Sequence, residues 1–296
     1  MTPAVFSQFM DTPLSITSDG MRSLMATGAS LMSDTRNGGK MLEDARNRIE
    51  AEETKSEGDE PIKRRDYFGN LIEEYSFDEE SAVATIPLRG IVSRGLGRIG
   101  EYFGYADIEK FASNIRNAAS DTNVQRVILN IDSPGGTVLG TADAAGEVEA
   151  LAALKPVMVY TNGLLASAAY YVAAPAHLII ASQSAYVGSI GAYMMIKDAD
   201  TSKQGMCPVS YTVFRSGKLK GAGIDALTKE QTEMLQAEIE KTGEKFRSYV
   251  SRFRSIQRED MEGQVFTGSD AVERGFVHAI ASHRGAAKTV FNTYND

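Results

Sequence analysis

The chain has 296 residues, 43% of them hydrophobic, which is enough to bury one substantial core. Its formal net charge of -8 at pH 7 disfavours nucleic acid as a partner, because neutralising phosphates needs a basic surface. The single cysteine, Cys207, cannot form an intrachain disulfide and has no histidine near it in sequence. It therefore predicts a small buried thiol and not a nucleophile.

The N-terminal residues show no basic stretch followed by an apolar run, so the sequence predicts no secretory signal. No stretch approaches the roughly 18 to 20 apolar residues that span a bilayer. We therefore expect a soluble cytoplasmic protein that has no membrane anchor and is not secreted.

Composition divides the chain into four predicted parts. Residues 1–32 mix apolar positions such as Leu14 and Ile16 with turn residues, which predicts an arm that packs on another part of the molecule. Residues 33–66 are dense in charge and poor in large apolar side chains, as in a helical or flexible linker. The main domain is predicted over 67–283, and a C-terminal tail over 284–296.

Apolar runs alternate with helical patterns after the linker. Continuous, short, β-branched runs predict strands buried on both faces at 82–88, 126–131, 157–161, 178–181 and 209–214. Helices are predicted at 107–119, 141–154, 168–174 and about 228–255, the last opened by a capping box at Thr228 and Gln231. The stretch 265–280 predicts strand, helix, strand. Together these predict a layered α/β domain with a parallel sheet.

The motif DSPGG, residues 132–136, directly follows a predicted strand. Paired glycines at a strand end let the backbone turn sharply and leave N–H groups facing a ligand or a developing oxyanion. A tight structural turn is the other interpretation of the same residues.

The motif GLLASAAYY, residues 163–171, leads from a strand through small residues into an Ala-rich helix. Ser167 then lies at a helix N-terminus, with the Ala168 N–H beside it as an oxyanion donor. A serine that merely caps the helix is the other interpretation.

The motif RSGKLKG, residues 215–221, holds two lysines between glycines. A serine hydroxyl is a poor nucleophile without a base, and a lysine can serve if burial keeps it partly neutral. Lysines in loops are usually solvated, but Gly217 and Gly221 would let one turn inward.

Taken in this order, the signatures DSPGG, ASAAYY, VGSIGAYM and RSGKLKG resemble the Ser/Lys-dyad peptidase family of signal peptide peptidase A and the phage head-maturation proteases. The resemblance runs from about residue 82 to residue 280. It implies a Clp-protease/crotonase-like layered fold with a parallel sheet and flanking helices, preceded here by the N-terminal arm.

The resemblance also assigns roles by position. It places the nucleophile at Ser167, the general base at Lys220 and an oxyanion glycine at Gly136, with Lys218 as the alternative base. The serine of the GSIG segment is Ser189, which in relatives hydrogen-bonds the lysine. A neutral amine needs its hydrogen bonds satisfied and aimed, so Ser189 would hold Lys220 toward Ser167.

One departure from the family pattern follows the nucleophile, where relatives commonly carry glycines and this chain has Ala168 and Ala169. Both are small enough to keep the helix start but would narrow the rim of the pocket. The implied chemistry is acyl transfer, with the N–H groups of Gly136 and Ala168 binding the oxyanion and no metal or cofactor. A triad using His177, His278 or His283 is the alternative.

The segment DTPLSITSDGM before a charged linker resembles the arm of phage head-maturation proteases. Those enzymes cleave scaffold and other capsid-assembly proteins inside immature heads and often process themselves. Scaffold, capsid or portal proteins are therefore the expected partners, in the cytoplasm of the bacterium or inside the immature head. Relatives assemble into rings, so a homo-oligomer is expected, to which the long polar helix at 228–255 could contribute.

Three alternatives remain open at this point. The chain could be a cytosolic protease like signal peptide peptidase A, or a crotonase-like acyl-CoA enzyme, which would use glycine-turn N–H groups without Ser167 or Lys220. It could also be an inactive assembly protein that keeps only the fold.

Overall fold

A computed structural model describes residues 14–17, 35–55, 65–66, 69, 72, 75–194 and 227–293. The predicted strand 209–214, Cys207 and both lysines of the SGKLK motif, Lys218 and Lys220, lie outside the described residues.

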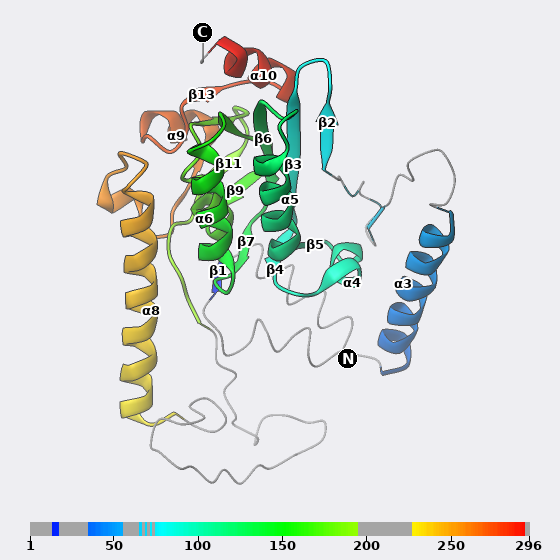
Figure 1. Cartoon of the computed structure of the whole chain (residues 1–296). Helices are drawn as coiled ribbons and strands as arrows, with labels where there is room; N and C mark the ends of the chain where they lie inside the picture. The colour runs from blue at the N-terminus through cyan, green and yellow to red at the C-terminus, as the bar shows by residue number, and fades with distance from the viewer. Residues whose placement is uncertain are drawn as a thin grey trace.

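A six-stranded sheet in the order β13-β10-β8-β6-β3-β2 forms the centre of the molecule (Figure 1). Its strands are β2 (Ser76–Asp78), β3 (Val83–Arg89), β6 (Arg126–Asp132), β8 (Val157–Thr161), β10 (Leu178–Ala181) and β13 (Ala279–Ile280). All neighbours pair in parallel except the edge strand β2, which is antiparallel to β3. The predicted α/β fold with a parallel sheet is confirmed, and the four predicted strands within the described residues agree with these to within one residue.

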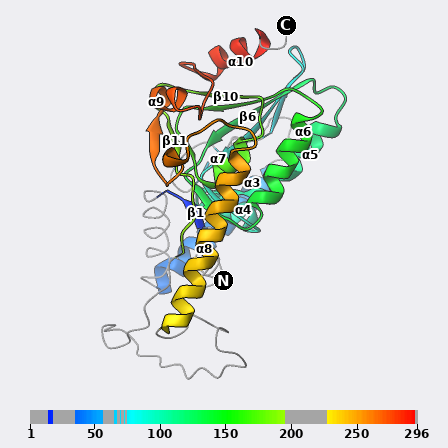
Figure 2. The ribbon, with the colours of Figure 1, turned by 90° about the vertical axis from the view of Figure 1, so that its left-hand side faces the viewer.

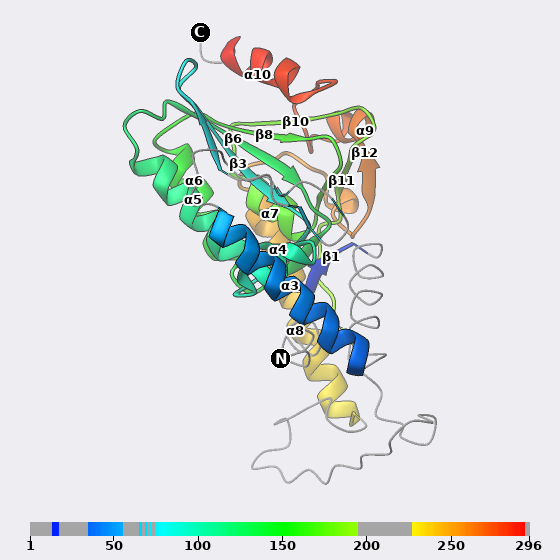
Figure 3. The same ribbon diagram turned by 90° about the vertical axis from the view of Figure 1, so that its right-hand side faces the viewer.

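Helices cover the two faces of this sheet unequally, as Figures 1 and 3 show. One face packs against α5 (Ile108–Ser120), α6 (Thr141–Ala152) and α7 (Ala168–Ala173), and the other against α10 (Arg284–Thr293). Alternate strand residues serve the two faces, so that in β8 Val157 and Val159 face the first group and Met158 and Tyr160 face α10. The sequence did not predict α10, which lies in the predicted tail.

The long helix α8 (Lys229–Val250) runs along one side of the molecule and extends beyond its body (Figure 2). The predicted capping box is present, with Thr228 Oγ1 accepting from the Gln231 N–H and the Gln231 side chain accepting from the Thr228 N–H. The prediction that the helix continues to residue 255 was wrong. The chain turns after Val250 because Ile256, 8% exposed, joins the core beneath the helix.

Two small sheets complete the fold. One has the order β1-β7-β4-β5 and consists of β1 (Leu14–Ile16), β7 (Gly135–Thr137), β4 (Ile91–Ser93) and β5 (Tyr105–Asp107). The other has the order β12-β11-β9 and consists of β12 (Val265–Thr267), β11 (Tyr186–Gly188) and β9 (Leu164–Ala166). An isolated bridge pairs Ser133, two residues before β7, with Leu165 of β9, so the two small sheets approach the same region.

The N-terminal segments pack on this region through a separate apolar cluster, which comprises Leu14, Ile16, Ala45, Tyr102, Phe103 and Tyr105. Ala45 belongs to α3 (Thr35–Lys55) and Tyr102 to α4 (Gly97–Tyr102), and the guanidinium of Arg48 on α3 lies 5.8 Å from the Tyr102 ring centroid. The predicted linker thus contains a helix. No described helix is both long and apolar enough to cross a membrane.

Candidate functional site

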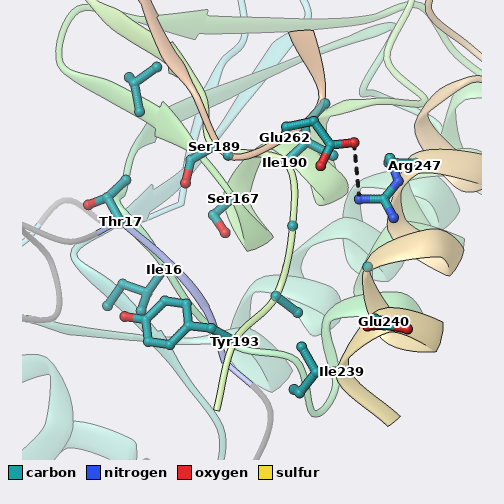
Figure 4. Close-up of a pocket in the computed structure, with 15 residues that line it drawn as sticks. Ile16, Thr17, Ser167, Ser189, Ile190, Tyr193, Ile239, Glu240, Arg247 and Glu262 are labelled. Carbon is teal, nitrogen blue, oxygen red and sulfur yellow. Dashed lines mark ion pairs between the residues drawn. The ribbon is translucent and has the colours of Figure 1, made fainter. Parts of the chain in front are cut away.

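Ser167 lies at the junction of β9 and α7, 1% exposed, with a backbone φ of 57° and ψ of -122°. A non-glycine residue in this conformation is strained, and such strain persists only where the surroundings enforce it. Ser167 occupies the N-cap position, yet its side chain makes no capping hydrogen bond. The interpretation of Ser167 as a simple helix cap is therefore wrong. Its hydroxyl points into a pocket instead (Figure 4).

The DSPGG motif holds the strand that carries Ser167. The Leu164 N–H donates to Asp132 Oδ1 at 2.9 Å, and the Ser133 N–H donates to the Leu164 carbonyl at 2.7 Å. The Ala166 N–H in turn donates to the Ser133 carbonyl at 3.2 Å. Gly163 is required by this contact, because a Cβ there would lie 2.2 Å from Asp132 Oδ1. Two motifs separated in sequence therefore form one structural unit.

Ser189 reaches the same pocket from β11. β9 and β11 are parallel neighbours that pair Ala166 with Gly188, so the residues after each strand end at the same edge. The Ser167 N–H donates to the Gly188 carbonyl at 2.8 Å, and the Ser189 N–H donates to the Gln264 carbonyl at 2.6 Å. Ser189 also has a positive φ, 54°. The structure thus brings Ser167 and Ser189 together, and their side chains lie side by side in Figure 4.

Gly136 lies in β7, an inner strand of the four-stranded sheet, between β1 and β4. A Cβ at this position would lie 2.0 Å from the Val92 carbonyl oxygen, so close packing alone demands glycine here. Gly136 does not line the pocket that holds Ser167, whereas Ile16 and Thr17, on or next to its partner strand β1, do. Ala168 is fully buried at the first position of α7 and does not line the pocket either.

The pocket has a volume of about 470 Å³ and is built from Ser167 and four other parts of the chain. They are the end of β1, the stretch after β11, one side of α8 and the segment before β12, represented by Thr17, Tyr193, Arg247 and Glu262. Arg247, only 16% exposed, forms an ion pair with Glu262 at 3.9 Å and another with Glu244 at 3.1 Å. None of these four lining residues was predicted as a site residue from the sequence. Tyr193 lies in the VGSIGAYM motif and Thr17 in the predicted arm, whereas Arg247 and Glu262 come from segments with no motif.

None of the three histidines lines this pocket. Nδ1 accepts a backbone N–H in each of them: from Val157 in His177, from Ile179 in His278 and from Ala286 in His283. Burial, together with the charge of Arg254, lowers the pKa of His177 and His278. These contacts give the histidines structural roles and do not favour a Ser/His/Asp triad.

The described residues contain no group of three or more His, Cys, Asp or Glu side chains placed to hold an ion. The base predicted for Ser167, Lys220, lies outside the described residues, as does Lys218. The described site is therefore a strained serine and a second serine at the ends of parallel strands, facing a half-polar pocket.

These features define an α/β protein in which a strained serine, Ser167, faces a pocket. The profile of peptidase family S49 matches residues 149–292, which contain Ser167, Ser189 and the SGKLK motif. Over these residues the chain is therefore similar to peptidase family S49.

Curated relatives agree with this assignment. A protein of Methanocaldococcus jannaschii that carries a protease name is 34% identical over 62% of this chain and 60% of its own. "Protease 4" of Salmonella typhi is 32% identical over 69% of this chain and 33% of its own. "Capsid assembly protease C" of phage lambda is 28% identical over 71% of this chain and 49% of its own. The chain thus spans less than two thirds of the length of each relative.

Solved structures of both predicted fold types align with the chain. A ClpP1 variant from Listeria monocytogenes is 14% identical over 68% of this chain and 93% of its own, with a TM-score of 0.45. An enoyl-CoA hydratase of Mycobacterium smegmatis is 12% identical over 75% of this chain and 74% of its own, with a TM-score of 0.41. Neither alignment bears on the chemistry of the site.

Proposed function

We propose that this protein is a serine endopeptidase in which Ser167 attacks the scissile carbonyl and Lys220 takes its proton. The observation that carries the proposal is the backbone of Ser167, which is strained and turns the hydroxyl into the pocket instead of onto the helix that it begins. Strain of this kind is typical of residues whose side chain must be presented for chemistry. The match to the family S49 profile over residues 149–292 and the protease names of the relatives support the same activity.

The remaining roles are those that the sequence motifs predict. In the proposed mechanism the N–H groups of Gly136 and Ala168 bind the oxyanion, and water then hydrolyses the acyl-enzyme. Ser189 shares the pocket with Ser167. Its hydroxyl would donate a hydrogen bond to the neutral amine of Lys220 or accept one from it, and so hold that amine toward Ser167. No metal or cofactor enters this scheme.

The direct test compares the parent with Ser167→Ala in cleavage of an unfolded protein substrate. We expect the rate to fall by at least about 1,000-fold, because the nucleophile is removed. Ser182→Ala is the matched control, since Ser182 is also buried, its Oγ has no hydrogen-bond partner among the described residues, and it does not line the pocket. Equal cleavage by the parent and Ser167→Ala would contradict the proposal.

The base is tested separately. Lys220→Arg should abolish cleavage because a guanidinium does not deprotonate at accessible pH, whereas Lys218→Arg should leave it largely intact. We also expect cleavage by the parent to increase toward alkaline pH as the neutral amine becomes populated. Loss of activity in Lys218→Arg alone would move the base to that residue.

For the substrate we propose scaffold and other capsid-assembly proteins, including this chain itself, with the protein working as a homo-oligomeric ring in the cytoplasm or in immature heads. The supporting observations are the similarity to the phage lambda protease and the arm before the main domain. The similarity to Protease 4 equally supports a cytosolic protease of the signal peptide peptidase A type.

Incubation with purified scaffold and capsid proteins, or with synthetic signal peptides, separates these substrates. Cleavage of the capsid proteins at discrete sites favours the phage branch, and cleavage of signal peptides alone favours the other. Hydratase or thioesterase activity that survives Ser167→Ala would instead indicate a crotonase-like enzyme. A lack of any activity in the parent would indicate an assembly protein.

A further inference from the structure

Strand β1 lies between two backbone edges beside the pocket. On one side it pairs antiparallel with β7, in the register Leu14 with Thr137, Ser15 with Gly136 and Ile16 with Gly135. On the other side Leu14 exchanges both backbone hydrogen bonds with Tyr193, at 2.8 and 2.9 Å. β1 therefore fills a slot whose two walls both offer strand-type hydrogen bonds.

The register pairs β1 with β7, the strand that contains the predicted oxyanion residue Gly136. The Thr17 N–H donates to the Pro134 carbonyl at 2.9 Å, continuing the ladder by one residue. Hydrogen-bonded pairs alternate along an antiparallel ladder, so Ser15 and Gly136, two residues away, form the next such pair. The backbone N–H and C=O groups of Gly136 that face the slot are thus hydrogen-bonded to the backbone of Ser15.

Side chains anchor β1 in the slot. Leu14 and Ile16 are 0% and 3% exposed and pack in the apolar cluster with Tyr102 and Tyr105. Ile16 and Thr17 also line the pocket that contains Ser167, and Figure 4 shows both on the side of the pocket opposite Arg247. No second polypeptide can pair with this edge of β7 while β1 is bound there.

An extended polypeptide binds a sheet edge by adding a strand, with main-chain hydrogen bonds providing affinity. We infer that residues 14–17 are an intramolecular occupant of the slot where this peptidase receives an extended substrate strand, and that they must leave before another polypeptide binds. This inference rests on the proposed peptidase function. Because the occupant is tethered, its effective concentration is on the order of millimolar, which is enough to exclude weak peptides.

The test measures peptide binding without turnover. A fluorescent peptide with the sequence of residues 10–20 is titrated, by anisotropy, into full-length Ser167→Ala and into the same chain that also carries Leu14→Asp. An aspartate at the buried position 14 should release β1, so we expect the peptide to bind at least about 10-fold more tightly to the double variant. Leu154→Asp with Ser167→Ala is the matched control, since Leu154 is 70% exposed and belongs neither to the pocket nor to the apolar cluster that anchors β1, and it should bind like Ser167→Ala alone.

A second variant guards against misfolding of Leu14→Asp, which thermal melting would reveal. Ser15→Pro in the Ser167→Ala chain removes the N–H that pairs with Gly136 and leaves the cluster intact, so it should also tighten peptide binding. All of these variants carry Ser167→Ala. The inference would be overturned if the folded Ser15→Pro variant bound the peptide no more tightly than Ser167→Ala alone. It would also be overturned if the Leu14→Asp variant bound the peptide no more tightly than the Leu154→Asp control.

The two ideas fail in different ways. Tighter binding to the released variants, combined with a parent that cleaves nothing, would sustain the slot and remove the peptidase. A parent that cleaves, with peptide affinity unchanged by either substitution in β1, would sustain the peptidase and remove the intramolecular occupant.

Discussion

The six-stranded sheet and the three-stranded sheet β12-β11-β9 share one core but differ in burial and in backbone conformation. In the larger sheet, β8 is buried at all five positions and β10 at all four, and alternate residues serve opposite faces. In the smaller sheet, β9 and β11 are each followed directly by a serine with positive φ, Ser167 and Ser189. Among the described residues only Ala82, in the turn before β3, is a further non-glycine residue of this kind.

The larger sheet therefore stabilises the fold, whereas the smaller sheet places two serine side chains at the pocket. The strands of the larger sheet have ordinary backbones and apolar side chains, so burial stabilises them directly. Ser167 and Ser189 are polar, strained and adjacent to the pocket, so they gain nothing comparable from their positions. The packed sheet supplies the free energy that holds the smaller sheet in its strained form.

Phe291 on α10 gives the largest expected effect, and it should affect stability alone. The side chain is 0% exposed on the face of the larger sheet away from the pocket. Phe291→Ala should lower the free energy of unfolding by about 3–5 kcal/mol, measured by urea denaturation, because it leaves a cavity. Cleavage per folded molecule should not change.

The neighbouring residue provides the control for Phe291. Val290 lies on the same helix but is 40% exposed. Val290→Ala should change the free energy of unfolding by no more than about 0.5 kcal/mol. Loss of catalytic activity in folded Phe291→Ala would mean that the two regions are coupled more tightly than this comparison implies.

A substitution at Gly136 should affect both the free energy of unfolding and the rate of cleavage. A Cβ 2.0 Å from the Val92 carbonyl would push β7 away from β4, so Gly136→Ala should cost about 1–3 kcal/mol and reduce cleavage as well. Gly146, inside α6, has no atom within 4 Å of a Cβ. Gly146→Ala should therefore be neutral or stabilising by up to about 1 kcal/mol. A folded, fully active Gly136→Ala protein would remove this glycine from the site.

The sequence predicted the larger sheet well, because short β-branched runs between helical patterns have few other solutions. It did not predict β7, β9 or β11, which are only three residues each and too short to show a periodic pattern. Their pairing depends on contacts such as that of Leu164 with Asp132, which no local pattern reveals. Helix α10 was missed for a related reason, since only two of its side chains, Ala287 and Phe291, are buried.

The sequence predicted only those site residues that lie in a recognisable motif. Ser167, Ser189 and Gly136 were named from the sequence, and the structure places the first two in one pocket. Thr17 and Arg247 were not named, because Thr17 belongs to an arm and Arg247 to a helix whose polar pattern is typical of a solvated surface. Lys220 remains a prediction, since it lies outside the described residues.

Substitutions at Ser167 measure the strain directly. Glycine adopts positive φ without a Cβ penalty, so Ser167→Gly should be more stable than Ser167→Ala by about 1 kcal/mol in urea denaturation. At Ser182, which is buried with an ordinary backbone, the order should reverse, with glycine about 0.5–1 kcal/mol less stable than alanine. The same order at both positions would show that the backbone of Ser167 stores no strain.

The smallest expected effect is a dependence of stability on pH that arises in the larger sheet. Burial, followed by the charge of Arg254, lowers the pKa of His177 and His278 below the ordinary value of 6.5. Above that value both rings are neutral whether the chain is folded or unfolded, and they add no pH dependence. As the pH falls through it, the unfolded chain binds protons that the folded chain resists, so the free energy of unfolding decreases.

Urea midpoints at about pH 7.5 and 5.5 isolate this effect from the carboxylates. Hydrogen bonds from Lys288 and Ser81 lower the pKa of Asp78 to about 2, and those from Arg258 and Arg247 lower that of Glu244 to about 2. The stability that these carboxylates provide is fully present above their unfolded values of 3.8 and 4.5 and is lost only below that window. His278→Gln should therefore reduce the change in midpoint between the two pH values, because glutamine can still accept the Ile179 N–H but does not titrate. An unchanged difference would mean that His278 titrates alike in the folded and unfolded chain.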